Sequence, residues 1–457
     1  MSTTPAPSFD PAEDPIFTPL RFRNLTVKNR VFRSNISGRF DNDDGSLTQT
    51  RINWESRFAN GGVGAVISSY VPVAMHGRII AGYATIHRDD FIPLWDKLGQ
   101  AVHSFDCRYI VQLSHSGRQM DLPGVHNQHR PSPSSTSRKE SLHGFLCRAM
   151  GRGEIERLVA DFARAAWRAR EAGLDGVELH AANGYLFTQF LSSAINDRTD
   201  LYGGTLANRA RFLLDVIGAI RAQVGRDFHV QVKLSAVDHN NVVPWEGKGN
   251  TLADTIAVAR WCEAVGADAI HVSTGSLFPH PLNPPGDLPL EVLAVTYDAM
   301  ISSGVDSFRN FLFFRYPLLR PLFRWLWYRI KGDRGNEAIS IDEARAIRAA
   351  VSIPVISTGG YQTASVVREG LSTGAFDGVS IARSLVANPD LVRQWRAGHD
   401  QPAKPCTYCN KCLFNAPKNP MGCYEEARFP SREAMIAEIE KIYHARPHLR
   451  VPSSAEL

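Results

Sequence analysis

Long apolar runs are missing from this sequence, and their absence excludes a chain that spans a membrane repeatedly. The least charged long stretch, residues 61–77, is broken by Ser, Pro and His and is too short to cross a bilayer. The N-terminus has neither a basic start nor an apolar core, so we do not expect a secretory signal peptide. These absences predict a cytoplasmic protein.

An excess of one charge sign is missing too, and cysteine is scarce. The chain has 51 basic and 46 acidic residues and no long basic run, which does not indicate nucleic-acid binding. Only seven of the 457 residues are cysteines, and Cys107, Cys147 and Cys262 are scattered. The other four lie within residues 406–423. In a reducing compartment, such clustered cysteines are more often ligands than disulfides.

Short β-branched runs alternate along the chain with longer amphipathic runs. The eight strand candidates are residues 30–36, 63–69, 109–115, 176–180, 229–235, 268–274, 353–359 and 377–383. Helix-period runs such as 153–173 and 208–225 lie between them. Eight strand–helix units without a short repeat predict an α/β fold, a (β/α)8 TIM barrel. The alternative, a doubly wound sheet, would normally carry a G-x-G-x-x-G turn after its first strand, and none is present.

The expected organisation has three parts. A flexible lead covers residues 1–15, the barrel covers 16–400, and a cysteine-rich segment with a C-terminal tail covers 401–457. An aromatic and basic insertion interrupts the barrel at about 276–335. In such barrels the chemistry lies where the strands end. The strand ends supply Ser37, Gln112 to His115, His180, Lys233, Gly359, Gly360 and Arg383.

One long stretch resembles a known family. "GVELHAANGYLFTQFLSSAINDRTDLYGGTLANRARF" (176–212) is similar to the Old Yellow Enzyme family of FMN-dependent oxidoreductases. The resemblance continues through "PLRFRNLTVKNRVFRSNIS", "QLSHSGR", "VKLS", "STGGY" and "IARSLVANPDL". It therefore extends over almost the whole chain and implies that FMN is the cofactor.

The residues that the resemblance assigns to FMN also suit a flavin chemically. They are Ser34, Ile36, Ser37, Gln112, Lys233, Gly359, Gly360, Ala382 and Arg383. The amide of Gln112 can match the alternating carbonyl and N–H groups of the flavin edge. A cation at Lys233, where the family usually has Arg, favours the reduced flavin. The glycines and Arg383 lie at the usual phosphate site of these barrels.

The resemblance also assigns the substrate side. It implies that His180 and Asn183 bind a carbonyl oxygen and that Tyr185 is the general acid. The expected reaction transfers hydride from reduced FMN to the β-carbon of an unsaturated carbonyl or enoyl compound, which could be lipophilic or an acyl-CoA. We expect His271 to face the barrel or its mouth, and the loop histidine His280 to be a weaker catalytic candidate.

The clustered cysteines have the spacing C-x2-C-x2-C-x10-C, at Cys406, Cys409, Cys412 and Cys423. Thiolates at such intervals are typical of one corner of a [4Fe–4S] cluster, whereas zinc sites more often use two separated pairs. Zinc and unligated thiols stay as alternatives. The element resembles the branch that contains 2,4-dienoyl-CoA reductase and trimethylamine dehydrogenase, although that branch spaces its second and third cysteines one residue wider.

In that branch a dinucleotide-binding region follows the cysteines, but here only residues 424–457 follow Cys423. We therefore expect either direct reduction of FMN by NAD(P)H or a separate redox partner protein that feeds the cluster. An amine dehydrogenase or demethylase that exports electrons through the cluster is the alternative function, and a non-enzymatic scaffold is a third. A homo-oligomer is compatible with the sequence.

Residues 308–331, between the sixth and seventh strands, contain nine aromatic residues and six cations. The cations recur throughout, and Pro317 and Pro321 interrupt the stretch, so it is not a transmembrane helix. Soluble proteins rarely leave so much apolar surface in water. The segment is expected either to pack on its own barrel or a second subunit, or to lie at the inner face of the membrane.

Overall fold

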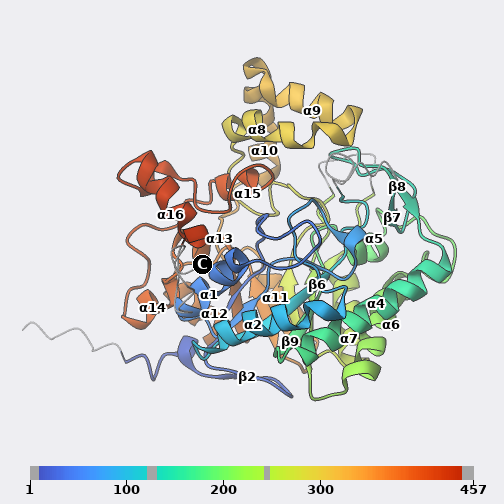
Figure 1. Cartoon of the computed structure of the whole chain (residues 1–457), viewed down its shortest axis with the longest axis horizontal. Coiled ribbons are helices and arrows are strands. Elements are labelled where there is room, and N and C mark those ends of the chain that lie inside the picture. The colour runs from blue at the N-terminus through green and yellow to red at the C-terminus, as the bar shows by residue number, and fades with distance from the viewer. Residues whose placement is uncertain (1–9, 121–130, 241–246, 445–457) are drawn as a thin grey trace, which may run out of the picture.

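The structure is a computed structural model that describes residues 10–120, 131–240 and 247–444 (Figure 1). Residues 1–9 of the expected N-terminal lead and 445–457 of the expected tail lie outside these ranges.

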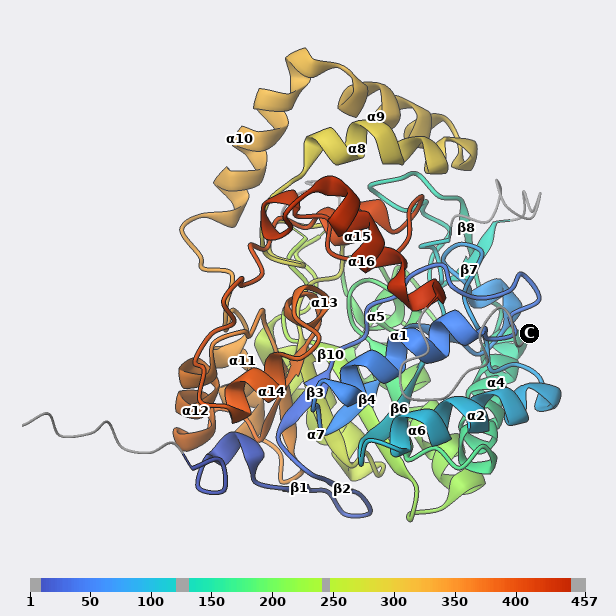
Figure 2. The same cartoon turned by 60° about the vertical axis from the view of Figure 1, so that its left-hand side comes forward.

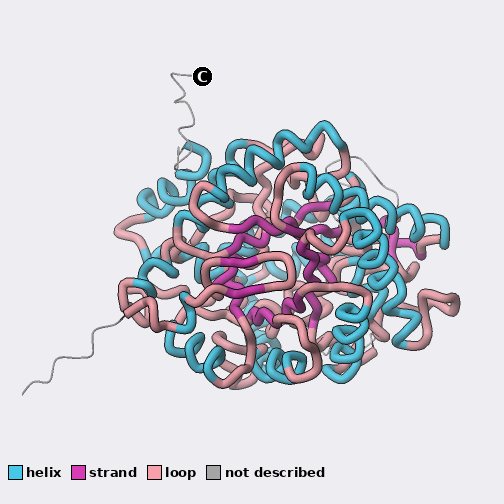
Figure 3. The backbone as a smooth tube through the Cα atoms, turned by 90° about the horizontal axis from the view of Figure 1, so that it is seen from below, coloured by secondary structure: helices cyan, strands magenta, loops and turns pink. Residues whose placement is uncertain are grey.

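Eight parallel strands close into a barrel. They are β3 (Val31–Arg33), β4 (Ala65–Ile67), β6 (Arg108–Ser114), β9 (Gly176–Ala181), β10 (His229–Ser235), β11 (Ala269–Ser273), β12 (Val355–Thr358) and β13 (Gly378–Ile381). The ring closes because β13 pairs with β3 and β4 pairs with β6. Seen from below, the strands form a ring surrounded by helices (Figure 3). The predicted TIM barrel is confirmed, and each strand overlaps its predicted run.

Helices cover the outside of the barrel. They are α1 (Gln49–Asn60), α2 (Ile92–His103), α4 (Arg152–Glu171), α5 (Leu186–Leu191), α6 (Leu206–Val224), α7 (Leu252–Ala264), α11 (Ile341–Arg348), α12 (Ala364–Ser372), α13 (Arg383–Ala387) and α14 (Leu391–Arg396). Within the described ranges, no helix has both the length and the apolar character needed to cross a bilayer.

Residues alternate along each strand between an apolar outer face and the barrel interior. The interior is apolar at one end of the barrel and polar at the other. Val230, Val232 and Leu234 of β10 belong to the large core under the helices, while the intervening residues of the strand point inward. At one end of the barrel the interior is apolar, where Leu20 and Val27 of the hairpin β1–β2 (Leu20–Arg21 and Thr26–Val27) cluster with inward residues. At the other end the inward residues are polar, and this is the end that the sequence predicts to hold the site.

Two further groups of elements lie at that end. The chain between β11 and β12 forms α8 (Leu290–Thr296), the 3-10 helices η4 (Tyr297–Ser303) and η5 (Pro317–Leu319), α9 (Val305–Arg315) and α10 (Arg320–Lys331). The cysteine-rich segment carries α15 (Lys411–Asn415) and is followed by α16 (Arg432–His444), which packs against α1. Figure 2 shows α8, α9 and α10 as a cap above the barrel, with α15 beneath them.

Candidate active site

A cavity of about 310 Å³ opens where the barrel strands end. Its walls include Ser34, Asn35, Ile36, Ser37, Tyr70, Tyr83, Phe145, His180, Asn183, Tyr185, Lys233, Ser273, Thr358, Ala382, Arg383 and residues of α8, η4 and α15. A smaller cavity of about 80 Å³ adjoins it, shares Thr358, Ala382 and Arg383 with it, and is lined by Gly359 and Gly360. Most of the residues that the sequence assigns to the flavin and the substrate therefore lie around two neighbouring cavities.

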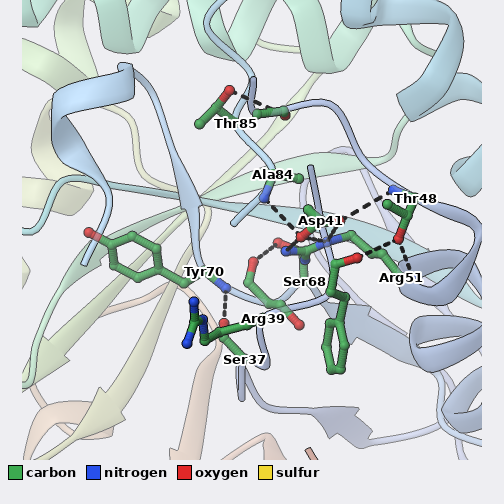
Figure 4. A network of polar contacts seen from close by, with 12 residues as sticks. Ser37, Arg39, Asp41, Thr48, Arg51, Ser68, Tyr70, Ala84 and Thr85 are labelled. Carbon is green, nitrogen blue, oxygen red and sulfur yellow. Dashed lines mark hydrogen bonds and ion pairs between the residues drawn. The ribbon is translucent and has the colours of Figure 1, made fainter. Parts of the chain in front are cut away.

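The loop after β3 is anchored by a polar network on the cavity side of the barrel (Figure 4). The backbone N–H of Tyr70 donates to Ser37 Oγ at 2.7 Å. Asp41 accepts from Arg51 Nη2 at 2.6 Å and from the backbone N–H of Ala84 at 2.8 Å. Since Asp41 and Arg51 are both buried at their charged ends, this paired anchor fixes the loop that carries Ser37.

Glu178 lies at the centre of the polar barrel interior. Its carboxylate accepts from Gln112 Nε2 at 2.8 Å, from Gln231 Nε2 and from His271 Nδ1 at 2.7 Å. Burial opposes ionisation of this carboxyl, but the neighbouring His271 and Lys233 outweigh burial and lower its pKa to about 2. Glu178 is therefore a buried negative charge, and the predicted inward position of His271 is confirmed by its contact with this carboxylate.

Gln112 is oriented by Glu178. Because its Nε2 donates to the carboxylate, its Oε1 points elsewhere, and this atom is buried without a hydrogen-bond partner among the described residues. A buried acceptor with no partner is costly, so it fits an N–H of a group that the structure does not contain. The flavin edge offers such an N–H. Gln112 itself is fully buried and is not among the residues that line the two cavities.

Lys233 brings a cation to the wall of the larger cavity. Its Nζ donates to Asn35 Oδ1 at 2.5 Å and lies 3.5 Å from Ser34 Oγ. Burial lowers the pKa of Lys233 to about 8, against the opposing attraction of Glu178. The ammonium is therefore charged at neutral pH but titrates within reach of ordinary buffers.

His180 and Tyr185 form an aromatic group with Tyr70. The ring centroids of His180 and Tyr185 are 4.8 Å apart, and those of Tyr70 and Tyr185 are 5.2 Å apart. Burial holds the pKa of His180 well below its ordinary value, so the imidazole is neutral. Both of its ring nitrogens are buried without a partner within the described chain. A neutral imidazole keeps one N–H to donate, and here that donor is unused.

Tyr185 keeps its proton at every ordinary pH, because burial raises the pKa of its hydroxyl. The hydroxyl is thus a proton donor rather than a phenolate. Tyr70 is different, because its hydroxyl already donates to the carbonyl of Gly77 at 2.9 Å. Of these two tyrosines on the cavity wall, Tyr185 is the better candidate for a general acid.

The side-chain amide of Asn183 is already hydrogen-bonded within the protein, which the sequence does not indicate. Its backbone has a positive φ of 60°, and its Nδ2 donates to the carbonyl of Thr274 at 3.0 Å and to Asn283 Oδ1 at 2.9 Å. An amide has two N–H donors, so both are used inside the protein. Binding a substrate carbonyl through Asn183 would require one of these bonds to break, and this role stays a prediction.

Arg383 connects the smaller cavity with the cysteine-rich segment. Its guanidinium donates to the carbonyl of Pro285 and to Asn410 Oδ1, both at 2.5 Å, and lies 5.3 Å from the ring centre of Tyr408. The hydroxyl of Tyr408 donates to the carbonyl of Gly360. The end of β12, the end of β13 and the cysteine-rich segment are therefore held together around one cation.

The four clustered cysteines line one small cavity together. Cys406, Cys409, Cys412 and Cys423 lie around it with Arg383 and Arg428. Burial raises the pKa of each of these thiols. Across residues 10–120, 131–240 and 247–444, however, no group of three or more His, Cys, Asp or Glu side chains stands close enough to hold a metal ion. The donor set suits a cluster, but the structure does not show one.

One candidate from the sequence, His280, lies outside the cavity, and three residues in or near the cavity were not predicted from the sequence. His280 is stacked on His239 at 6.0 Å and is not among the lining residues, so its position does not support a catalytic role. Tyr70 comes three residues after β4, and Glu178 comes two residues before His180 on β9. Both could have been found by reading the strand ends and the strand alternation. Phe145, by contrast, comes from a loop with no such signal.

Comparison with family models gives two matches. The model described as NADH:flavin oxidoreductase / NADH oxidase family matches residues 15–285. The model described as dihydrouridine synthase matches residues 329–451.

Similar proteins carry related descriptions. The NADH oxidase of Thermoanaerobacter brockii is 30% identical over 397 residues, which are 86% of this chain and 52% of the relative. The 4,4'-dithiodibutanoate disulfide reductase of Rhodococcus erythropolis is 29% identical over 427 residues, which are 90% of this chain and 94% of the relative. The NADPH dehydrogenase of Listeria welshimeri is 35% identical over 263 residues, which are 57% of this chain and 74% of the relative. The chain thus spans about half the length of the NADH oxidase.

Two solved structures share the fold. A 2-naphthoyl-CoA reductase in complex with 2-naphthoyl-CoA has a TM-score of 0.73 at 23% identity, covering 90% of this chain and 56% of its own. An old yellow enzyme homologue from Zymomonas mobilis has a TM-score of 0.64 at 22% identity, covering 89% of this chain and 99% of its own. At these identities the likeness extends to the barrel architecture.

Proposed function

The chain belongs to the NADH:flavin oxidoreductase / NADH oxidase family, and this membership supports FMN and NAD(P)H as its cofactors. We propose that it is an ene-reductase. Its substrate would be an α,β-unsaturated carbonyl or an enoyl compound. The observation that carries this proposal is the unused, neutral imidazole of His180 beside the protonated hydroxyl of Tyr185.

FMN, when bound, supplies the hydride for the β-carbon of the substrate. Gln112 Oε1 would accept an N–H from the cofactor, while Glu178 holds the amide in that orientation. The Lys233 ammonium would favour the negative charge that the flavin edge gains on reduction. Ser34, Ile36, Ser37, Gly359, Gly360, Ala382 and Arg383 complete the proposed cofactor site.

His180 would donate its N–H to the substrate carbonyl oxygen and stabilise the negative charge that develops there. Asn183 would also donate to the substrate carbonyl oxygen only if its hydrogen bond to Thr274 or to Asn283 breaks. Tyr185 would give its proton to the α-carbon, so the C=C bond is reduced and the tyrosine is reprotonated from solvent. The apolar and aromatic walls around Tyr83 and Phe145 would limit the access of water to a bound substrate.

An amine dehydrogenase or demethylase is the alternative function, and one relative is described as an N,N-dimethylglycine/sarcosine dehydrogenase. The aromatic walls would suit a cationic amine. Lys233 and Arg383 belong to the proposed cofactor site, and no carboxylate of the described residues lines the cavity to pair with a cationic amine. This charge pattern favours an electron-poor carbonyl compound over a cationic amine.

The experiment that tests the proposal is anaerobic turnover with a panel of substrates. Enones and enoyl-CoAs should be converted to saturated products at the expense of NAD(P)H, whereas methylamines should leave the oxidised flavin unchanged. Flavin reduction by methylamines with no turnover of any enone would reverse the choice between the two functions. Protein that cannot take up FMN would contradict both.

The cysteine-rich segment belongs to the proposal as an electron entry site. We infer that Cys406, Cys409, Cys412 and Cys423 hold a [4Fe–4S] cluster that a separate redox protein could reduce. Anaerobically purified protein should contain about four irons per chain. The variant Cys412→Ser should lose most of this iron, while the matched variant Cys262→Ser, at a buried thiol elsewhere, should keep it. Zinc without iron would contradict the cluster.

A further inference from the structure

The helices α9 and α10 with the turn between them, residues 305–331, form the outer cap of the molecule. Figure 2 shows α9 above α8, and α10 running from the top of the cap down toward the barrel. Their inner side is packed: Phe311, Phe314 and Phe323 join Leu290, Leu293 and Tyr297 in a separate apolar cluster. Trp327 is buried and donates to the carbonyl of Gly286 at 2.9 Å. The outer cap is therefore a fixed part of the fold.

A second apolar stripe covers the opposite side of the outer cap. Leu318, Leu322, Trp325 and Leu326 recur at helical spacing, and their exposed fractions are 91%, 57%, 56% and 41%. On α9, Val305 and Phe308 are 85% and 50% exposed. An ordinary surface helix has one apolar face and one polar face. Since α10 is apolar on both faces and only one is packed, the outer stripe is a contact surface.

The charges of residues 305–331 are mostly positive, although Arg309 pairs with Asp306 and Arg324 pairs with Glu291 of α8. Residues 305–331 contain six basic residues and a single acidic one, Asp306, which gives a net charge of +5. That equals the formal charge of the whole chain. The Arg329 guanidinium lies 5.2 Å from the ring centre of Trp325, on the exposed stripe itself. Apolar and aromatic side chains thus alternate with cations on the same exposed surface.

The combination of exposed apolar side chains and positive charge indicates which partner the outer stripe contacts. A second copy of the chain in a symmetric contact would bring one +5 surface against another, and like charges would oppose it. An anionic lipid surface offers both an apolar layer and negative headgroups. We propose that the outer cap docks on an anionic membrane surface, with Leu318, Leu322, Trp325 and Leu326 entering the headgroup region and the surrounding arginines meeting lipid phosphates.

The position of the outer cap gives this contact a consequence. Leu293, Thr296, Tyr297 and Met300, on the elements directly beneath the cap, form one wall of the larger cavity. A docked molecule would therefore hold that wall next to the bilayer, where lipophilic compounds are concentrated. This consequence for substrate delivery rests on the proposed function, whereas the docking does not.

Flotation with lipid vesicles tests the docking directly and needs no activity. The full chain should float with vesicles of phosphatidylcholine and phosphatidylglycerol, should bind much less to phosphatidylcholine alone, and should be released by high salt. The double variant Leu318→Ser/Leu322→Ser should bind at least about tenfold more weakly. The matched variant Leu201→Ser/Val265→Ser, at exposed apolar residues elsewhere, should bind like the wild type.

Two further variants, each of which removes two positive charges, test the docking if the serine variant folds poorly. Arg315→Gln/Arg329→Gln should weaken binding to anionic vesicles, while Arg152→Gln/Arg345→Gln, which removes the same charge from α4 and α11, should not. Recovery of wild-type protein in the soluble fraction at low salt would overturn the proposal. So would equal losses in both charge variants, or a concentration-dependent dimer that the serine variant abolishes without any vesicle binding.

Discussion

Lys233 and Tyr185 carry the proposed chemistry at the scale of single residues. The two differ in how pH affects them. Burial lowers the pKa of Lys233 to about 8, so its charge is present below that pH and lost above it. Burial raises the pKa of Tyr185, so its proton is held throughout the same range.

The first prediction concerns the FMN reduction potential. If the Lys233 ammonium stabilises the reduced flavin as proposed, the midpoint potential should fall more between pH 7 and pH 9.5 in the wild type than in Lys233→Arg, because an arginine stays charged across this range. Spectroelectrochemical titration at several pH values measures this. Parallel curves for the two proteins would show that Lys233 does not titrate near the flavin.

The second prediction concerns Tyr185. Replacing it with Phe should slow alkene reduction by about 10²–10⁴-fold and leave flavin reduction by NAD(P)H nearly unchanged, because only alkene reduction takes a proton from Tyr185. Stopped-flow absorbance separates the two half-reactions. The control is Tyr83→Phe, which removes a hydroxyl from another part of the same cavity wall. A similar loss in both half-reactions would remove Tyr185 from the acid role.

At the scale of elements, Asn410 is one of the residues that attach the cysteine-rich segment to the barrel, together with Tyr408. Asn410 is 1% exposed and has a left-handed backbone with φ of 60°. Its side chain accepts from Arg383 and donates to the carbonyl of Asp287 at 2.9 Å. A short polar side chain tolerates this backbone better than alanine does.

The third prediction follows from these contacts. Asn410→Ala should lower the free energy of unfolding by about 1–3 kcal/mol, because Arg383 and the Asp287 carbonyl lose a buried partner. It should also lower the iron content of purified protein. Thermal unfolding and metal analysis measure both, with Asn419→Ala in the same segment as the control. Asn410→Gly removes the bonds without the backbone strain, so equal stability of the Gly variant and the wild type would contradict the attachment role.

The barrel was predictable from the sequence because β-branched runs and amphipathic runs alternate with the right lengths. His180 and Lys233 were expected at this end of the barrel from the strand ends, whereas Tyr185 was expected there only from the family resemblance; all three line the same cavity. The engagement of Asn183 with Thr274 and Asn283 did not, since it depends on a loop whose conformation has no local pattern. The same holds for the buried orientation of Gln112, which Glu178 imposes from a neighbouring strand.

At the scale of the whole molecule, three parts meet at one end of the barrel: the cavity, the cysteine-rich segment and the outer cap. Arg383 contacts Asn410 and lines both the cavity and the space between the cysteines. Tyr297 lines the cavity and packs against Phe314 of the outer cap, with the two ring centroids 5.1 Å apart. Electron supply, chemistry and the proposed membrane contact would therefore be neighbours rather than separate regions.

The central claim is that the reduced flavin in this cavity delivers its electrons to an electron-poor alkene. The most direct measurement is a single turnover in which photoreduced enzyme, free of NAD(P)H, is mixed anaerobically with cyclohexenone. We expect the absorbance of oxidised FMN to return and cyclohexanone to form in proportion to the flavin. A flavin that stays reduced with cyclohexenone and with every enoyl-CoA offered would contradict the account.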